Sequence, residues 1–156
     1  MEDLSKIQWQ WRCFTDFTAA QMHEILAVRQ EVFVVEQKCV YLDADCFDCS
    51  SFHLLGRAED GQLGAYARLS FPGSRYQEPS IGRLLTTASY RGRGLGRMAL
   101  RLAIKKSRRE YPGKVIRISA QLHLESFYGE FGFRGRGLPY DEDGIAHIDM
   151  FLEQDG

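Results

Sequence analysis

The sequence predicts a mixed α/β (α+β) fold in which a central mixed β-sheet is flanked by helices. Three observations favour this fold: several short stretches alternate apolar and polar residues, two longer stretches have apolar residues at helical spacing, and no linker is long enough to divide the chain. The expected order is strand, helix, three strands, helix, strand, helix, strand, which is typical of a sheet covered by helices. We therefore expect residues 1–156 to form a single domain.

The first elements are a strand and a helix. Residues 7–13 alternate apolar and polar side chains, as in a half-buried strand. Thr18 is a suitable cap for a helix whose apolar face runs from Met22 to Phe33. Residues 34–51 carry acids and cysteines without a clear period, so we expect an irregular segment there.

Three strands follow the irregular segment. Residues 52–58 and 63–71 are strand-like, and Asp60-Gly61 between them is a strong signal for a hairpin turn. Pro72-Gly73-Ser74 interrupts the pattern, and residues 81–87 form the next expected strand. These strands form the predicted centre of the sheet.

The C-terminal part is predicted to alternate helices and strands. A long helix begins after the glycines near residue 94 and ends before Pro112-Gly113. Residues 115–121 form a short strand, residues 126–131 a short helix ended by Gly132, and residues 145–152 a final strand.

The amino-acid composition argues against some classes of function. The chain is 44% hydrophobic and 26% charged, and its 20 basic and 21 acidic residues give a net charge of −1. This balance argues against bulk binding of nucleic acid. Residues 1–6 lack the apolar core of a signal peptide, and no apolar run approaches the roughly 20 residues that span a bilayer. We expect a cytoplasmic protein that contacts neither membrane nor nucleic acid.

The four cysteines leave a second possibility open. Cys39, Cys46 and Cys49 lie close together in the sequence, and the last two form a single CxxC pair, whereas Cys13 is separate. One such pair is a weak indication of a zinc or redox site. Reduced structural or exposed thiols are the other interpretation. We predict no metal site.

A turn rich in arginine and glycine, Arg-Gly-Arg-Gly-Leu-Gly-Arg at residues 91–97, opens the long helix. A helix start has free backbone N–H groups and a partial positive charge, so it favours anions. Glycines allow a ligand to approach the backbone, and arginines bind phosphate. Between residues 91 and 109 there are eight basic residues and no acidic one. The turn therefore predicts a site for a polyphosphate.

The spacing of the glycines separates three phosphate-binding patterns. A Walker loop needs Gly-Lys-Ser/Thr, which is absent here, and the third glycine comes one residue too early for the dinucleotide pattern GxGxxG. Residues 91–96 fit the pattern Arg/Gln-x-x-Gly-x-Gly/Ala. The same letters recur at residues 134–138 with Pro139 and acids following instead of a helix. We expect the second copy to be a loop or sheet-edge segment.

The pattern at residues 91–96 resembles the acetyl-CoA pyrophosphate loop of the GNAT N-acetyltransferase superfamily. Downstream, Phe127-Tyr128 and Gly132-Phe133 match the superfamily, whereas Gln121 and Leu124 stand where Asn and Ala are common. Within the superfamily the chain is similar to the bacterial ElaA-like proteins. The segments that carry this resemblance are Arg29 with residues 32–37, residues 120–124, and residues 142–147.

The resemblance implies a GNAT-type acyl-CoA N-acyltransferase fold. It also implies direct transfer of an acetyl group from acetyl-CoA to a primary amine of a small molecule or peptide. A bulge is expected to separate the strand at residues 81–87 from its neighbour. The residues expected to bind the donor are Leu84, Leu85, Thr86, Arg91, Gly92, Arg93, Gly94, Leu95, Gly96, Arg97, Gln121, Ser126 and Phe127.

Three catalytic residues are expected. Tyr128 matches the tyrosine that serves as general acid in many members, although an ordinary tyrosine is less acidic than a thiol, so it acts mainly as a hydrogen-bond donor to the sulfur. His123 is the first candidate for the base, with Glu36 and His147 as second choices. Each base candidate also has a structural interpretation. For Glu36 this is an ion pair with Arg29.

The acceptor side leaves alternatives open. Acids that would attract a cationic amine are Glu36, Asp43, Asp45, Glu142 and Asp143. Arg68 and Arg83 would either bind a carboxylate of the acceptor or pair with these acids. We expect a monomer or homodimer. The alternative function is an acyl-CoA-binding regulatory or interaction protein without catalysis.

Overall fold

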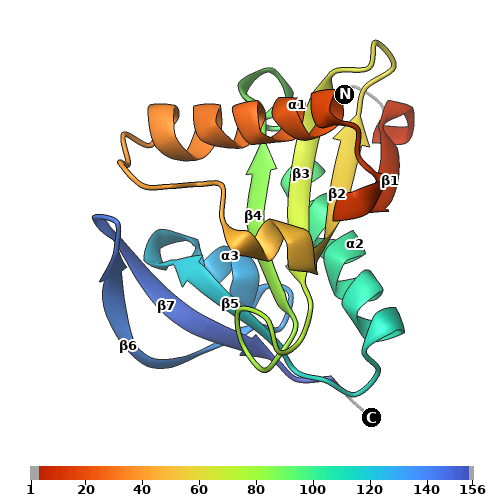
Figure 1. The fold of residues 1–156 in the computed structure, drawn as a ribbon. Coiled ribbons are helices and arrows are strands. Elements are labelled where there is room, and N and C mark those ends of the chain that lie inside the picture. Colours follow the sequence, from red (N-terminus) through yellow and green to blue (C-terminus); the bar gives the residue numbers. More distant parts are fainter. Residues whose placement is uncertain (1–3, 155–156) are drawn as a thin grey trace.

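The computed structural model describes residues 4–154, and the first three residues, which bear on the expectation of no signal peptide, lie outside this range. Seven strands form one sheet in the order β1-β2-β3-β4-β5-β7-β6 (Figure 1). Their bounds are β1 Gln8–Cys13, β2 Ser51–Arg57, β3 Leu63–Ser70, β4 Ser80–Thr86, β5 Ile116–Gln121, β6 Arg134–Glu142 and β7 Ile145–Leu152. The neighbours β4 and β5 are parallel and all other pairs are antiparallel, which confirms the mixed sheet.

Three α-helices accompany the sheet in the described chain: α1 Ala19–Gln30, α2 Leu95–Glu110 and α3 Glu125–Gly129. Thr18 caps α1 as predicted, because its hydroxyl accepts a hydrogen bond from the Gln21 backbone at 3.1 Å. The helix continues as a π-helical turn, η3 Glu31–Glu36, so residues 34–36 are helical and not irregular as expected. Short 3-10 turns complete the structure: η1 Leu4–Lys6, η2 Phe14–Asp16, η4 Cys46–Ser50, η5 Ala88–Tyr90 and η6 Leu122–Leu124.

The helices α1 and α2 cover opposite faces of the sheet. Neighbouring side chains of a strand point to opposite faces. On β3, Tyr66 packs with Ile25 of α1, whereas Ala67 packs with Ala99 of α2. All eight residues of β3 are buried for this reason.

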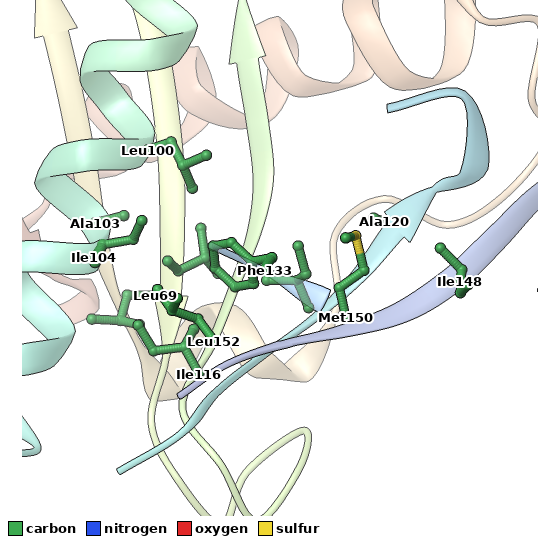
Figure 2. Close-up of a cluster of buried hydrophobic side chains, with 12 residues drawn as sticks. Leu69, Leu100, Ala103, Ile104, Ile116, Ala120, Phe133, Ile148, Met150 and Leu152 are labelled. Carbon is green, nitrogen blue, oxygen red and sulfur yellow. The ribbon is translucent and has the colours of Figure 1, made fainter. Parts of the chain in front are cut away.

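The largest apolar cluster joins α2 to β5 and β7, with Phe133 at its centre (Figure 2). Phe133 is 2% exposed and lies between the side chains of Leu100 and Ile104 on one side and Met150 on the other. Burial of such a side chain stabilises the fold by about 2–3 kcal/mol. The cluster anchors α2, and with it the turn that precedes the helix.

The strands β4 and β5 diverge after a single paired position (Figure 1). Within the described residues they pair only at Ser80 and Arg117. On its other side β4 contains the expected bulge, because the register with β3 shifts between Tyr66 and Arg68 and Arg83 has a φ of +51°. Beyond Ser80, the β5-facing backbone of β4 is therefore left without a strand partner.

The edge strand β6 adds an element to the predicted order. It contains the second Arg-Gly-Arg-Gly-Leu copy and pairs with β7, with a register shift between Arg136 and Tyr140. Its residues are mostly exposed, so no apolar alternation marked it as a strand. Pro139 is tolerated because an edge strand has one unpaired side. No helix in the described part of the chain is long and apolar enough to cross a membrane.

Candidate active site

A cleft of about 310 Å³ opens where β4 and β5 diverge. It is lined by residues of β4 and β5, by the segment after α1, by α3, and by the turn between β6 and β7. Of the residues predicted for donor binding and catalysis, Leu84, Gln121, Tyr128 and His147 line it. The residues predicted for the acceptor side that line it are Asp45, Arg83, Glu142 and Asp143. A larger hollow of about 470 Å³ over Trp9 and Arg57, at the opposite edge of the sheet, contains no predicted site residue.

Tyr128 is held in the cleft by the aromatic residues around it. Its ring packs edge-on against Phe127 and Phe133, with ring centroids 5.2 and 6.0 Å away. No hydrogen bond to its hydroxyl is found among the described residues. Burial raises the pKa of Tyr128 to about 12, so the phenol remains protonated at neutral pH. It is therefore a half-buried hydrogen-bond donor without a partner in the described chain.

The start of α2 leaves backbone groups exposed, as the sequence predicted. Gly92 and Gly94 have φ values of +77° and +81°, a conformation that glycine adopts without steric cost. Gly94 is the N-cap, and its carbonyl accepts the first helical bond from Met98 at 3.1 Å. The next backbone N–H groups, beginning at Leu95, have no partner within the helix. A Cβ at Gly92 would meet no atom within 4 Å, which is consistent with an open face there.

The arginines of this turn make exposed ion pairs. Arg91 Nη2 lies 2.5 Å from Glu36 Oε2, and Arg97 Nη1 lies 2.5 Å from Glu130 Oε2. Arg93 stacks on the ring of Tyr90. Exposed pairs of this kind contribute about 0–1 kcal/mol, so a stronger anion can replace the carboxylates. The partner of Glu36 is thus Arg91, and the expected ion pair of Glu36 with Arg29 is wrong.

Arg29 belongs to a largely buried ring of alternating charges, which we call the ion-pair ring. In order, its members are Arg29, Asp43, Arg83, Asp45, Arg68 and Asp48. The six nitrogen–oxygen distances between neighbours run from 2.6 to 3.3 Å, and the last member returns to the first. The three charges of each sign cancel. The ring holds the 43–48 segment against α1, β3 and β4, and Asp45 and Arg83 form its edge toward the cleft.

His147 of β7 and Glu142 at the end of β6 face each other in the cleft. His147 Nδ1 lies 2.7 Å from the carbonyl oxygen of Ile145, which only accepts hydrogen bonds, so Nδ1 carries a proton. Nε2 then faces Glu142 Oε2 at 3.3 Å. His147 is 8% exposed and stacks on Tyr140. The arrangement presents a basic nitrogen and a carboxylate to whatever enters the cleft.

Of the other predicted site residues, His123, Glu36, Ser126 and Phe127 do not line the cleft, whereas Gln121 does. His123 is exposed in η6, just after β5, and does not line the cleft. Glu36 does not line it either, because its side chain is turned toward Arg91. Gln121 Nε2 donates to Gln37 Oε1 at 3.2 Å and so joins β5 to the segment after α1. Ser126 and Phe127 belong to α3, where Arg97 stacks on the Phe127 ring.

The cysteines form no ligand cluster among residues 4–154. Cys39 is buried and its thiol donates to the carbonyl oxygen of Asp143 at 2.8 Å, which joins the wall of the cleft to the β6–β7 turn. Cys46 and Cys49 are exposed free thiols. The described residues hold no group of three or more side chains suited to bind a metal ion.

Comparison with known proteins gives a consistent result. The family model for the acetyltransferase (GNAT) domain matches residues 15–154. The chain is 57% identical to UPF0039 protein sll0451 of Synechocystis, over 94% of this chain and 96% of that protein. It is 35% identical to protein ElaA of Escherichia coli, over 94% of this chain and 97% of that protein.

Solved structures agree with the sequence comparisons. An acyl-CoA N-acyltransferase from Pseudomonas aeruginosa superposes with a TM-score of 0.88 at 36% identity, covering 94% of this chain and 99% of that one. The crystal structure of Escherichia coli ElaA gives a TM-score of 0.87 at 34% identity, covering 94% and 99%. The predicted fold and the predicted resemblance to the ElaA-like proteins are both confirmed.

Proposed function

The chain belongs to the GNAT acetyltransferase family, whose fold serves acyl transfer from acyl-CoA donors, and we propose that it transfers an acetyl group from acetyl-CoA to a primary amine. The observation that carries the proposal is the unpaired backbone of β4, which leads from the open start of α2 to the half-buried Tyr128 in the cleft. One end suits a pyrophosphate and the other a thioester. The acceptor is a small molecule or a peptide.

In this proposal the protein binds acetyl-CoA mainly through backbone groups, and side chains add to this binding. Leu84, Leu85 and Thr86 offer backbone groups that lack a β5 partner, and the N–H groups at residues 94–97 offer an anion site. Arg91, Arg93 and Arg97 would exchange their surface contacts for phosphate oxygens. The side chains proposed beside the pantetheine arm and the adenine end are Gln121, Ser126 and Phe127. Acetyl-CoA, when bound, supplies the acyl group.

The acceptor amine must lose a proton before it attacks. A lysine-like amine with a pKa of about 10.4 costs about 4.6 kcal/mol to deprotonate at pH 7. Of the three base candidates, His147 alone lines the cleft, so the proposal places the base at its Nε2, with Glu142 beside it to hold the ammonium. The Ile145 carbonyl holds the ring in the required tautomer.

Tyr128 serves the leaving group. Because its pKa is raised to about 12, full proton transfer to a thiolate with a pKa of about 8.5 is unfavourable. Its hydroxyl therefore acts as a hydrogen-bond donor to the sulfur. A backbone N–H of residues 84–86 is the proposed donor to the thioester oxygen.

The proposal is tested by measuring acetyl transfer in a panel of amines together with calorimetric binding of acetyl-CoA. Transfer is expected for at least one amine. Tyr128→Phe is expected to lower turnover roughly 100-fold and leave the Kd of acetyl-CoA within about twofold. Tyr111→Phe, at the end of α2 and away from the cleft, is the matched control and should change neither quantity. Tight binding of acetyl-CoA without transfer to any amine would instead identify a regulatory acyl-CoA-binding protein.

The location of the base is tested by a pair of histidine variants. His147→Gln is expected to lower kcat roughly 100-fold at pH 7 and to lose less activity at pH 9, where more of the amine is already neutral. His123→Gln should retain normal kcat, because its exposed side chain does not line the cleft. The reverse result, a loss in His123→Gln alone, would place the base in η6.

A further inference from the structure

The cleft is lined by more carboxylates than guanidinium groups, and both guanidinium groups have carboxylate partners. Two guanidinium groups and three carboxylates line it, those of Arg75, Arg83, Asp45, Glu142 and Asp143. Arg83 Nε lies 2.9 Å from Asp43 Oδ1, and its Nη2 lies 3.3 Å from Asp45 Oδ2. Arg75 Nη2 lies 3.5 Å from Glu142 Oε1. Both cations of the cleft are therefore already paired with carboxylates of the protein.

The ion-pair ring holds Arg83 in that pairing. Arg83 is one of six alternating charges in the ring, so releasing it to a ligand would leave Asp43 and Asp45 with one fewer cation. Asp43 is 5% exposed, and an uncompensated carboxylate at such a position is strongly unfavourable. An acceptor that carries a carboxylate would thus have to compete with the ring for Arg83.

The carboxylates of Glu142 and Asp143, which line the cleft, differ in their partners. No ion pair or hydrogen bond to the Asp143 side chain is found in the described part of the chain. Glu142 is shared between Arg75, His147 and the hydroxyl of Ser119, which lies 3.4 Å away. The two cations and three carboxylates that line the cleft have a formal charge of −1 together. The cleft therefore favours a cation over an anion or a zwitterion.

Much of the remaining wall of the cleft is apolar, beside the polar side chains of Gln37, Ser119 and Gln121. Side chains from the segment after α1, from η4 and from β7 form the apolar part, namely Phe33, Tyr41, Phe47 and Ile145. Aromatic walls favour a flat or alkyl body. The cleft measures about 310 Å³ and also has to admit the acyl end of the donor, so that body is small.

We infer that the acceptor is a small alkyl or aralkyl primary amine without a carboxylate beside the amine, rather than a free amino acid. The inference rests on the proposed function, because it names the substrate class of the same cleft. Glu142 and Asp143 receive the ammonium, and the aromatic wall receives the body. The ion-pair ring excludes the carboxylate by keeping Arg83 occupied.

Matched amines test the inference, because tyramine and tyrosine differ only in the carboxylate. We expect kcat/KM for tyramine to exceed that for tyrosine at least tenfold, with the same order for phenethylamine and phenylalanine. Phenylalanine amide controls for size, since it keeps bulk at the α-carbon without the negative charge, and should behave like the amine. Rates for tyrosine equal to or above those for tyramine would overturn the inference and leave the proposed function intact.

Binding provides a readout that does not need turnover. Tyramine and tyrosine are titrated by calorimetry into the protein saturated with coenzyme A, and only tyramine is expected to bind. Selective binding of tyramine without acetylation would contradict the proposed function alone, whereas binding of both or neither would contradict the inference. Asp143→Asn is expected to raise KM for tyramine roughly threefold at unchanged kcat. Glu59→Gln, an equal change of charge in the exposed β2–β3 turn, is the control and should leave KM unchanged.

Discussion

Two groups of three arginines in this protein have opposite environments. Arg29, Arg68 and Arg83 lie in the ion-pair ring, where the first two are 0% and 1% exposed and each contacts two aspartates. The arginines at residues 91, 93 and 97 are exposed around the start of α2. The residue type is the same, but burial commits the first group to structure, whereas exposure leaves the second available to a ligand. Arginine content alone therefore indicates no binding site.

The difference extends to the backbone that each group accompanies. At the start of α2 the backbone itself is the binding element, and the arginines add charge around it. In the ion-pair ring the side chains hold the backbone, including the left-handed Arg83 in the bulge of β4. A conformation of that kind costs about 1–3 kcal/mol and persists only where surrounding contacts impose it. The ring thus shapes the strand whose backbone is proposed to bind the donor.

The largest expected effect comes from breaking the ion-pair ring. Asp48 Oδ1 lies 2.6 Å from Arg29 Nη1 and 2.9 Å from Arg68 Nη1, so Asp48→Asn leaves two buried cations short of one carboxylate. We expect the free energy of unfolding to fall by about 3–5 kcal/mol, measured by urea denaturation. Glu153→Gln removes an exposed carboxylate paired with Arg136 and should change stability by less than about 0.5 kcal/mol. A loss for Asp48→Asn as small as that of the control would mean that the ring does not hold the fold.

Acid provides a second measurement on the same variant. Burial by itself raises the pKa of Asp48, but the hydrogen bond and charge of Arg29, followed by those of Arg68, outweigh it and lower the pKa. The unfolded chain then takes up the proton at a higher pH than the folded chain. The stabilisation is complete above about pH 4 and is lost as pH falls further. Stability of Asp48→Asn should therefore decline less steeply below pH 4 than that of the unaltered protein.

The two arginine groups also differ in how far the sequence predicts them. The helix start was predicted because capping, glycine spacing and helix periodicity are local, and all its parts lie within seven consecutive residues. The ion-pair ring joins one loop to α1, β3 and β4, and its partners are 14 to 40 positions apart in the chain. From the sequence, Arg68 and Arg83 were expected either to bind a carboxylate of the acceptor or to pair with the acids on the acceptor side of the site. In the structure both arginines form ion pairs with aspartates of the protein.

The proposed base and the edge strand show the same limit of prediction from a single sequence. His123 follows β5 directly, so local position favoured it, but η6 turns its side chain out to solvent. His147 reaches the cleft because β7 pairs with β5 at Gln121, a long-range register that a single sequence does not reveal. The segment of β6 was left open between a loop and a sheet edge, because its exposed residues carry no apolar alternation, and it is the edge strand of the sheet.

A smaller effect is expected from replacing an exposed arginine at the start of α2. The second Arg-Gly-Arg-Gly-Leu copy provides a matched control. Arg93 and Arg136 occupy the same place in the two Arg-Gly-Arg-Gly-Leu copies, but only the first copy opens a helix. Arg93→Ala is expected to weaken calorimetric binding of coenzyme A roughly tenfold, about 1.4 kcal/mol, because one charged contact to phosphate is lost. The free energy of unfolding should change by less than about 0.5 kcal/mol.

Arg136→Ala completes the comparison between a helix start and a sheet edge. Arg136 lies on β6 and pairs with Glu153 at 2.7 Å, so its removal should leave the Kd of coenzyme A unchanged. The tenfold effect of Arg93→Ala should shrink at 0.5 M salt, because the Debye length there is only about 4 Å and exposed charges are screened. Equal losses in the two variants, or a salt-independent loss in Arg93→Ala, would indicate that net positive charge and not the helix start selects the donor.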